Sequence, residues 1–361
     1  MNDRRGDDPE PGEDARAMGA RTIRDVARLA GVSIGTASKA LNAGGRLSLE
    51  TRAKVLRVAK ELDYRPNNLA QSLHRARSMT VGILSNDRFG RFTFPIVAAL
   101  ERLLFDDGIA VFMCNATDDP TRERRHIDQL LRKRVDGLVV TARRADCRAP
   151  IEPLARGVPV VYVFSRVEHS DALCLVPDDE GGARLAVQHL VRLGRRRIAH
   201  ITGPQHFEAV RLREKGYRAA LASAGLAAAP DLFRPGRWSE DWGRAAVHDL
   251  FANRAVAPDA LFCGNDQIAR GALDALREIG LAVPGDVAVV GFDNWDVMTL
   301  GARPLLTSVD MNLDALGTEA GHSLLQMMAG RKLCGVKRLP CSLVVRESCG
   351  AATGEGKGER S

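Results

Sequence analysis

The sequence predicts two kinds of structure in one chain: a small all-α head, followed by a larger α/β body built on parallel sheets. Short segments with a helical spacing of apolar residues fill positions 21–76. From Thr80 onward, short β-rich runs alternate with amphipathic stretches. A chain of 361 residues also exceeds what one hydrophobic core ordinarily holds, which favours two or three domains.

Charge separates the same two parts of the chain. Residues 21–80 hold twelve Lys and Arg against four acidic residues, whereas residues 1–20 hold three Arg against six acidic residues. The whole chain carries +7, so the remaining body is nearly neutral. A basic segment beside a neutral body favours a polyanion as the partner of that segment. A well-solvated small domain without such a partner is the alternative.

Composition argues against several classes of protein. No apolar run reaches the roughly 18 residues of a membrane helix, and positions 1–20 lack the apolar core of a secretory signal. We expect residues 1–20 and 350–361 to be disordered. The seven cysteines form no C-x-x-C pair, which argues against a disulfide framework or a zinc site. We therefore expect a cytoplasmic protein with no cofactor, no metal and no membrane partner.

The first predicted helix lies in "TIRDVARLA", where apolar residues recur at helical spacing. Thr22 and Asp25 form a capping-box pattern at its start, with Asp in place of Glu. Gly31 follows the segment, as expected for a residue that ends a helix in the left-handed conformation.

The second predicted helix spans about residues 34–41, with Ser33 as its cap. Ala37 and Leu41, together with Ala40, are expected to face the core. The opposite face carries short side chains and one cation, namely Ile34, Gly35, Thr36, Ser38 and Lys39. Two short helices joined by a glycine-containing turn form a helix-turn-helix, whose second helix lies in the DNA major groove. A helical cap without DNA contact is the alternative.

A third helix is predicted after Ser48, and a short hinge helix after Pro66. The third helix is expected to bury one face, formed by Val55, Leu56, Ala59 and Leu62. The hinge helix is too short to be stable alone. Its apolar residues Leu69, Ala70 and Leu73 therefore need a partner. An identical helix in a DNA minor groove provides one, with Leu73 as a wedge between base pairs.

In the body, predicted strands alternate with predicted helices. The strands are "TVGIL", "IAVFM", "DGLVV", "VPVVYV", "ALCLV", "RIAHIT", "ALFCG" and "VAVVGF". The helices are Pro95–Asp107, Thr121–Arg134, Glu180–Leu193, Arg213–Ala224 and Gln267–Ile279. This alternation predicts βαβ units in parallel sheets, enough for two lobes. Because ligands of parallel sheets bind at the carboxyl ends of the strands, we expect a ligand cleft between the lobes.

Head and body both resemble the lactose/galactose-repressor (LacI) family of bacterial transcription factors. In the head, the similarity rests on "TIRDVARLAGVSIGTASKALN" and "TRAKVLRVAKELDYRPNNLAQSL". In the body, it rests on "RVDGLVV", "PVVYV", "RLREKGYRAAL", "GNDQIARGALDALREIGLAVPGDVAVVGFDN" and "PLLTSVDMN". The resemblance implies a helix-turn-helix head with a hinge helix, and a two-lobed α/β body that is periplasmic-binding-protein-like.

For the head, the resemblance implies contacts with bases, with phosphates and with the minor groove. The implied DNA-binding residues are Thr22, Ser33, Ile34, Gly35, Thr36, Ser38, Lys39, Asn67, Ala70 and Leu73. Three positions depart from the family pattern: Gly35 is unusual inside a recognition helix, Ala37 replaces a common Val, and Lys39 replaces a common Arg. Because Lys lacks the planar fork of Arg, we expect an operator that differs from those read through an Arg.

For the body, the resemblance implies an effector site at the strand ends. The implied residues are Asp87, Arg91, Phe94, Phe164, Arg213, Trp238, Asn265 and Asp293. Structural alternatives stay open for four of them: an ion pair between Arg213 and Asp293 across the lobes, Asn265 as a helix cap, and Trp238 in the core. The segment Phe164–Arg166 lacks the Asp or Asn that relatives often carry there, which removes an acceptor for sugar hydroxyls. A sugar remains the expected ligand class.

The predicted organisation has five parts. They are a leader (1–20), a helix-turn-helix domain (21–64), a hinge helix and linker (65–78), an effector-binding and dimerisation domain (79–349) and a tail (350–361). Within the body, we expect a first lobe of about 79–163 plus a later segment. The second lobe then covers about 164–295 plus a C-terminal segment.

These features predict a transcriptional regulator that is not an enzyme. We expect a repressor that binds a palindromic operator in double-stranded DNA as a homodimer. Binding of a sugar or sugar derivative is expected to release it from the operator. Two alternatives stay open: the effector acts as a corepressor, or the protein activates transcription. Neither H-E-x-x-H nor a P-loop motif occurs, and the letters GVSIG at 31–35 join two predicted helices instead of forming a strand-to-helix elbow, so catalysis is disfavoured. An enzyme or a sugar-binding protein without a DNA role is the remote alternative, and the basic head argues against both.

Overall fold

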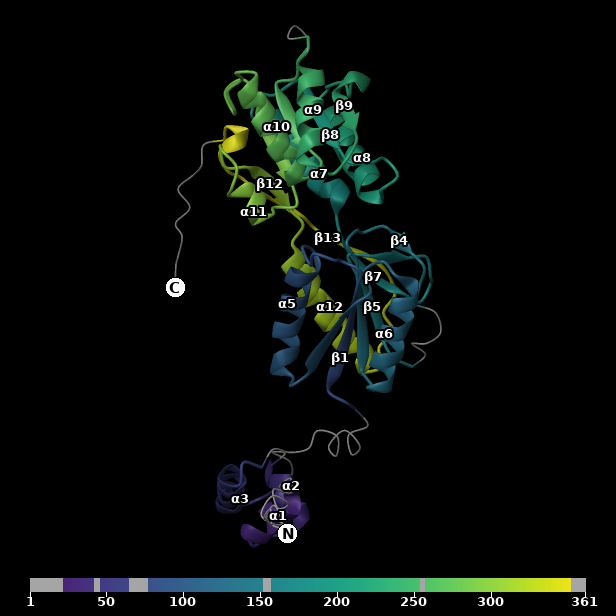
Figure 1. The fold of residues 1–361 in the computed structure, drawn as a ribbon, viewed down its shortest axis with the longest axis vertical. Helices are drawn as coiled ribbons and strands as arrows, with labels where there is room; N and C mark the ends of the chain where they lie inside the picture. The colour runs from purple at the N-terminus through teal and green to yellow at the C-terminus, as the bar shows by residue number, and fades with distance from the viewer. Residues whose placement is uncertain (1–21, 42–45, 65–76, 152–156, 254–256, 352–361) are drawn as a thin grey trace, which may run out of the picture. The chain divides into compact units, whose positions relative to one another are not determined.

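The computed structural model describes residues 22–41, 46–64, 77–151, 157–253 and 257–351. The chain divides into two compact units between Ser78 and Met79, and each unit is described by itself (Figure 1). The predicted hinge residues Asn67, Ala70 and Leu73 lie outside the described residues, as does the predicted leader.

Within its described residues, the head is built from α1 (Ile23–Leu29), α2 (Ile34–Leu41) and α3 (Leu49–Glu61). The predicted caps are confirmed. The Asp25 carboxylate accepts hydrogen bonds from Thr22 N (3.0 Å) and Thr22 Oγ1 (2.8 Å). Ser33 Oγ accepts one from Thr36 N (3.1 Å). Gly31 has a φ of 63°, which allows the chain to leave α1 and turn into α2.

A small core joins the three head helices. It consists of Val26, Ala27, Ala30, Ala37, Ala40, Val55, Val58 and Ala59. The prediction that Leu56 belongs to this core is wrong, since its side chain is 47% exposed. One residue along a helix is a rotation of about 100°, so Leu56 turns away from Val55, whereas Val58 at i+3 stays on the buried face. Leu41 and Leu62 pack at the edge of the core and are half-buried.

The first lobe of the body contains a six-stranded sheet in the order β13-β7-β5-β3-β1-β2. All its strand pairs are parallel. Its strands are β1 (Thr80–Ser85), β2 (Ala110–Asn115), β3 (Gly137–Thr141), β5 (Val160–Val163), β7 (Leu173–Pro177) and β13 (Gly335–Leu339). Helices α5 (Thr93–Asp106) and α12 (Leu313–Met328) cover one face of the sheet, and α6 (Pro120–Arg132) covers the other.

The second lobe repeats this plan with the order β14-β12-β11-β10-β8-β9. Its strands are β8 (Ile198–Thr202), β9 (Phe233–Pro235), β10 (Ala260–Cys263), β11 (Ala288–Phe292), β12 (Thr307–Asp310) and β14 (Ser342–Val344). Only the β12–β14 pair among these is antiparallel. Helices α7 (Asp179–Arg192) and α8 (Glu208–Ser223) cover one face, and α9 (Glu240–Leu250) and α10 (Asp266–Glu278) the other. Two short elements, α11 (Asp296–Thr299) and the β4 (Cys147–Arg148)–β6 (Arg166–Val167) pair, complete the body.

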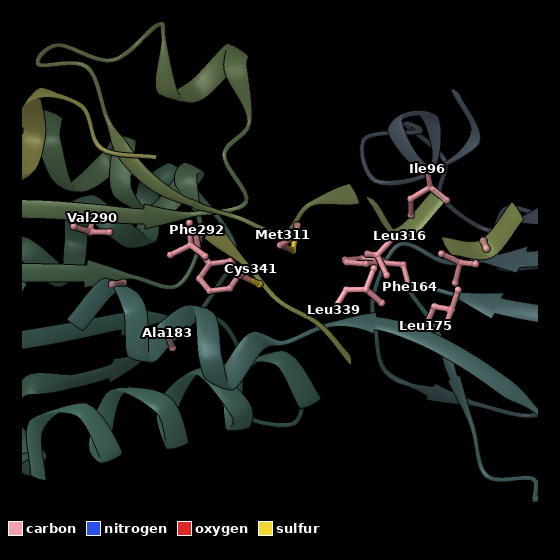
Figure 2. Close-up of a cluster of buried hydrophobic side chains, with 14 of the residues drawn as sticks. Ile96, Phe164, Leu175, Ala183, Val290, Phe292, Met311, Leu316, Leu339 and Cys341 are labelled. Carbon is pink, nitrogen blue, oxygen red and sulfur yellow. The ribbon is translucent and has the colours of Figure 1, made fainter. Parts of the chain in front are cut away.

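The chain passes between the lobes after β7, after β12 and after β13, so each lobe is discontinuous. The predicted end of the first lobe at residue 163 is therefore too early, because β7 at Leu173–Pro177 pairs with β5 in the first sheet. Buried apolar side chains follow these crossings, with Met311 and Cys341 beside the second lobe and Leu316 and Leu339 beside the first (Figure 2).

All eight predicted strand segments are present, with ends within two residues of those expected. One helix boundary is clearly wrong, because α8 begins at Glu208 rather than Arg213, which places Arg213 in the helix interior. Close approach of helices depends on glycine: a Cβ at Gly216 of α8 would lie 2.2 Å from the Glu180 carbonyl oxygen of α7.

Candidate effector cleft and DNA-binding helix

The exposed face of α2 carries the residues that the resemblance assigned to DNA. Ile34, Gly35 and Lys39 are exposed, and Thr36 and Ser38 are half-buried. An apolar side chain such as Ile34, 49% exposed at the start of a helix, is suited to contact a thymine methyl group. Thr22 and Ser33 stand at the N-termini of α1 and α2, where backbone N–H groups favour phosphate.

Gly35 has no packing reason to be glycine. A Cβ built at this position would meet only Ser33 Oγ, at 3.8 Å. Glycine inside a helix costs about 1 kcal/mol relative to alanine. Gly35 therefore destabilises α2 without contributing to the core. Because it has no side chain, the backbone at this position is accessible on the exposed face of the helix.

In the body, a cavity of about 730 Å³ lies between the two lobes at the carboxyl ends of the strands. All eight sequence-predicted effector residues line it: Asp87, Arg91, Phe94, Phe164, Arg213, Trp238, Asn265 and Asp293. The structure thus brings together residues that are more than 200 positions apart in the sequence. Their role in binding stays a prediction.

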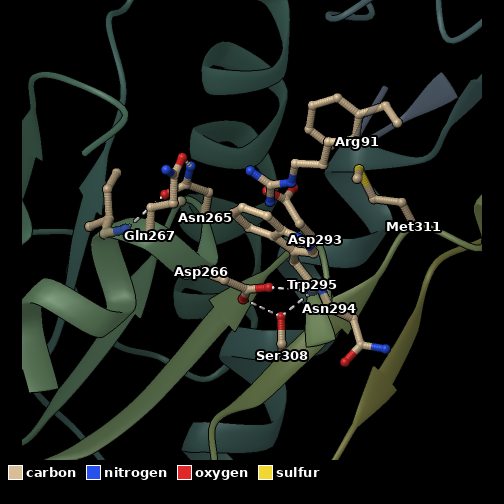
Figure 3. Close-up of polar contacts among 12 residues, drawn as sticks. Arg91, Asn265, Asp266, Gln267, Asp293, Asn294, Trp295, Ser308 and Met311 are labelled. Carbon is tan, nitrogen blue, oxygen red and sulfur yellow. Dashed lines mark hydrogen bonds and ion pairs between the residues drawn. The ribbon is translucent and has the colours of Figure 1, made fainter. Parts of the chain in front are cut away.

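Arg91 and Asp293 form an ion pair that joins the lobes inside this cavity (Figure 3). Arg91 precedes α5 of the first lobe, and Asp293 follows β11 of the second. The Arg91 guanidinium also lies over the Trp295 ring, 4.2 Å from its centroid, and over the Phe92 ring at 4.8 Å. Asp293 and Asn294 both have positive φ, at 105° and 50°. Left-handed backbone at two consecutive non-glycine residues is strained, and it aims the carboxylate into the cleft.

Arg213 is buried and belongs to a second ion pair. Its Nε and Nη2 donate to the Asp179 carboxylate at 2.8 and 2.7 Å, and Nη1 donates to the Gly264 carbonyl oxygen. The guanidinium lies 3.6 Å from the centroid of the Phe292 ring. Asp293 is 3.9 Å away, and both residues belong to the second lobe. The Arg213–Asp293 pair of the structural alternative is therefore present at this distance, but it lies within the second lobe and not across the lobes, and Asp179 is the main partner of Arg213.

Burial sets the protonation of the cleft acids. Burial raises the pKa of Asp179 and of Asp293, while the neighbouring guanidinium groups oppose the rise. Asp266 lies beneath them, accepting hydrogen bonds from Ser308 Oγ and from Trp295 N at 2.7 Å (Figure 3). Burial, and then the Asp293 charge, raise the pKa of Asp266 to about 8. A carboxyl with this pKa is protonated at neutral pH and holds the Trp295 loop as a neutral group.

Three predicted effector residues have a second, structural role. Asp87 accepts from Phe92 N and Thr93 N at 3.0 and 3.2 Å and so caps α5. Asn265 caps α10, because its Oδ1 accepts from Ile268 N at 2.9 Å, as the structural alternative proposed. Trp238 is half-buried and packs against the core of the second lobe while its ring also lines the cavity.

Aromatic side chains form much of the remaining wall. Phe164 has a φ of 53° and stacks on Phe92 with ring centroids 4.8 Å apart. Phe207 and Trp238 lie 6.5 Å apart on the second lobe. Flat apolar faces next to charged groups suit a ligand that has both a ring and polar substituents.

Several residues of the cleft were not predicted from the sequence. They are Phe92, Arg143, Arg144, Asp146, Asp179, Phe207, Gln267 and Trp295. Trp295 follows Asp293 by two positions and was detectable from its neighbour. Arg143 and Arg144 follow the predicted strand "DGLVV" directly, and a rule that inspects every strand end would have found them.

Other kinds of site are not found in the described part of the chain. No helix there is long and apolar enough to cross a lipid bilayer. No group of three or more His, Cys, Asp or Glu side chains there is placed to hold a metal ion.

Comparison with known proteins identifies both parts of the chain. Residues 22–67 match the family model described as bacterial regulatory proteins, lacI family. Residues 187–349 match a periplasmic binding protein-like domain.

Curated relatives extend the match over most of the chain. The ribose operon repressor of Escherichia coli (strain K12) is 35% identical over 299 residues, covering 82% of this chain and 89% of the relative. The HTH-type transcriptional regulator GalR of the same strain is 32% identical over 326 residues, with 90% and 94% covered.

Solved structures share the fold. The lac repressor dimer bound to operator and the anti-inducer ONPF matches with a TM-score of 0.75 and 31% identity, over 92% of this chain and 99% of that one. The transcriptional regulator CelR in complex with cellobiose matches with a TM-score of 0.63 and 32% identity, over 91% and 99%. The chain therefore belongs to the lacI family of bacterial regulatory proteins and is a DNA-binding transcriptional regulator.

Proposed function

We propose that the protein is a repressor that binds a palindromic operator as a homodimer and leaves it when a small effector, a sugar or sugar derivative, binds in the cleft. The observation that carries the proposal is the cavity between the lobes, whose walls come from both and which an ion pair spans. A ligand that touches both lobes stabilises one lobe arrangement over another, which is what an allosteric effector requires.

The DNA-binding part of the proposal rests on α2. We assign base and phosphate contacts to Ile34, Gly35, Thr36, Ser38 and Lys39, with Thr22 and Ser33 at helix N-termini. Asn67, Ala70 and Leu73 are assigned to the hinge from the sequence alone. A recognition helix of this kind reads one half-site, so a palindromic operator calls for two copies of the chain.

The surface that we assign to dimerisation is the outer edge of the first lobe. Strand β2 is the last strand of its sheet, and it exposes Phe112 and Met113, 52% and 37% accessible. Phe105 at the end of α5 is 71% accessible and precedes the same strand. Exposed apolar side chains on an unpaired sheet edge favour association with another protein surface. A second copy of this chain is the occupant that the lac repressor dimer supports.

The effector class follows from the cleft and from relatives. Rings from both lobes and fixed charges suit a polar cyclic molecule, and the relatives in solved structures hold cellobiose or the anti-inducer ONPF. A regulator of this kind acts where the chromosome of a bacterium is, so we assign it to the cytoplasm. An effector that acts as corepressor, or activation by the protein, is the second candidate, and the measurement below separates them.

A two-step experiment tests this proposal. Sugars and sugar derivatives are first screened for a rise in the Tm of the full chain, since a ligand that binds only the folded state stabilises it. Operator affinity is then measured with each stabilising compound. Release predicts a fall of about 5- to 150-fold, from a coupling of about 1–3 kcal/mol. A rise in operator affinity means a corepressor, and unchanged affinity contradicts both.

A further inference from the structure

Four arginines line the cleft, and two of them are neutralised inside the protein. Arg91 pairs with Asp293, and Arg213 pairs with Asp179. The four side chains of these two ion pairs are largely buried, so their charges are neutralised in a region with little water. A ligand that sought Arg91 or Arg213 through an anionic group would have to displace a carboxylate from each.

The other two arginines are adjacent and far less committed. Arg143 and Arg144 follow β3, and both line the main cavity as well as a second cavity of about 220 Å³. The Arg143 guanidinium lies 3.7 Å from Asp118, and the two side chains are 42% and 56% exposed. Arg144 lies over the Phe207 ring at 4.5 Å, and no carboxylate of the described residues forms an ion pair with it. Burial, and then the Arg143 charge, lower the pKa of Arg144, while the charges of Asp146 and Asp118 oppose this shift.

The loop that carries these cations is fixed by the protein. Asn86 Oδ1, in the second cavity, accepts a hydrogen bond from Arg143 N at 3.0 Å. Asp146 Oδ1 accepts one from Glu208 N at 2.8 Å, which ties the loop to α8 of the second lobe. The backbone of this loop is therefore held by contacts that do not use the two guanidinium groups.

The carboxylates of the main cavity are already committed to protein donors. Asp87 and Asp146 accept from backbone N–H groups, and Asp179 and Asp293 accept from guanidinium groups. The uncommitted groups are instead donors. A further one lies in the second cavity: Ser165 Oγ is fully buried and has no hydrogen-bond partner in the described part of the chain. A buried hydroxyl without a partner is costly unless a ligand or water satisfies it.

Resting on the proposed function, we propose that the effector carries an anionic oxygen group, a phosphate or a carboxylate, held by Arg143 and Arg144 at the wall that the two cavities share. Such a group accepts several hydrogen bonds from a guanidinium fork and relieves the repulsion between neighbouring cations. Ser165 is placed to donate to the same group in the second cavity.

Matched pairs of compounds test this inference on the full-length protein. The probes are D-ribose with ribose 5-phosphate, D-glucose with glucose 6-phosphate and with glucuronate, and inorganic phosphate alone. Calorimetric titration is expected to give tight binding for an anionic member and not for its neutral counterpart. The 6-phosphate and the uronate then distinguish phosphate from carboxylate, and inorganic phosphate shows whether the anion suffices.

Variants of the arginine pair provide the second arm. Arg144→Gln should weaken binding of the anionic compound about 10- to 100-fold, as loss of hydrogen bonds to a charged group does. Arg211→Gln is the matched control, because Arg211 is an exposed cation of α8 that donates to the His206 carbonyl oxygen. Equal binding of a neutral sugar, or unchanged binding by Arg144→Gln, overturns the inference.

The same titrations separate this inference from the proposed function. If a neutral sugar binds the protein and releases it from the operator, the proposed function stands and the proposal of an anionic effector is wrong. If an anionic compound binds through Arg144 and operator affinity stays the same, the anion site stands and the release mechanism is wrong.

Discussion

Arg91 of the first lobe and Asp293 of the second form an ion pair within the effector cleft, stacked on the Trp295 ring. This contact, together with the pair between Arg166 and Glu208 of α8, joins the two lobes. Contacts between the lobes contribute to the equilibrium between lobe arrangements that an effector shifts.

Arg91→Gln tests the role of this contact. The substitution removes the charge that joins the lobes, so the lobe arrangement with this pair becomes less populated. An effector that favours this arrangement is then needed at a higher concentration for release. We expect the effector concentration for half-release of operator to rise by roughly 5- to 150-fold, measured by fluorescence anisotropy. Arg102→Gln breaks an exposed Arg–Asp pair within the first lobe and should leave that concentration unchanged. Equal shifts in both variants would refute the role of Arg91.

The Arg213–Asp179 pair predicts a stability pattern. Both side chains are nearly buried, at 6% and 3% exposure. Arg213→Leu leaves a buried carboxylate without its partner, and we expect a loss of about 3–5 kcal/mol in the free energy of unfolding of the body. The double variant Arg213→Leu with Asp179→Leu should recover most of that loss, because no buried charge remains. Urea titrations of the wild type, Arg213→Leu, Asp179→Leu and the double variant check this, and additive losses in the double variant would count against it.

Gly35→Ala separates helix stability from DNA contact. A Cβ there makes only an ordinary contact with Ser33 Oγ at 3.8 Å, so alanine should stabilise the head by about 1 kcal/mol. If the open backbone at Gly35 lies against DNA, the same change weakens operator binding. In this one variant, thermal stability should therefore rise while operator affinity falls. Tighter operator binding by the alanine variant would show that Gly35 is not at the DNA surface.

Lys39→Ala tests how α2 reads its operator. If the ammonium group contacts a base, the loss should be about 1–3 kcal/mol at one operator position. If it contacts a phosphate, binding falls uniformly across sequences and the dependence on salt becomes shallower by about one ion. Titrations on single-base operator variants at several salt concentrations distinguish the two. No loss on any sequence would remove Lys39 from the interface.

The raised pKa of Asp266 predicts a dependence of stability on pH. Its ordinary pKa of 3.8 rises to about 8 in the folded protein, so between these values the folded state keeps a proton that the unfolded state loses. Stability from this group is complete below pH 3.8 and is lost as pH rises through about 8. Asp266→Asn mimics the protonated form at every pH. The wild type should therefore lose stability relative to this variant between pH 5 and 8, and parallel urea midpoints would contradict the assignment.

Local sequence patterns predicted the helices and strands, whereas pairing between distant strands determines which lobe each strand belongs to. Thr22 with Asp25, Ser33 and Gly31 are local signals that act within four residues, and the structure contains all of them. The strand β7 lies in the first lobe because it pairs with β5 and β13, which is a choice among distant partners that no local pattern shows.

The cleft residues divide in the same way. Arg213, Asn265 and Asp293 were predicted through family resemblance, and all three line the cavity. Asp179 was missed because "PDDEGG" reads as an acidic first turn of a helix, and only tertiary packing brings it against Arg213. Asp87 shows the reverse case, since its carboxylate is occupied by the backbone of α5.

The most direct test of the central claim is operator affinity measured with and without a stabilising effector, for the wild type and for Arg213→Gln. An effector that acts through this cleft should weaken operator binding of the wild type about 5- to 150-fold. It should leave Arg213→Gln bound to operator with unchanged affinity, while the exposed control Arg211→Gln responds like the wild type. Full release of Arg213→Gln by the same effector at the same concentration would contradict the account.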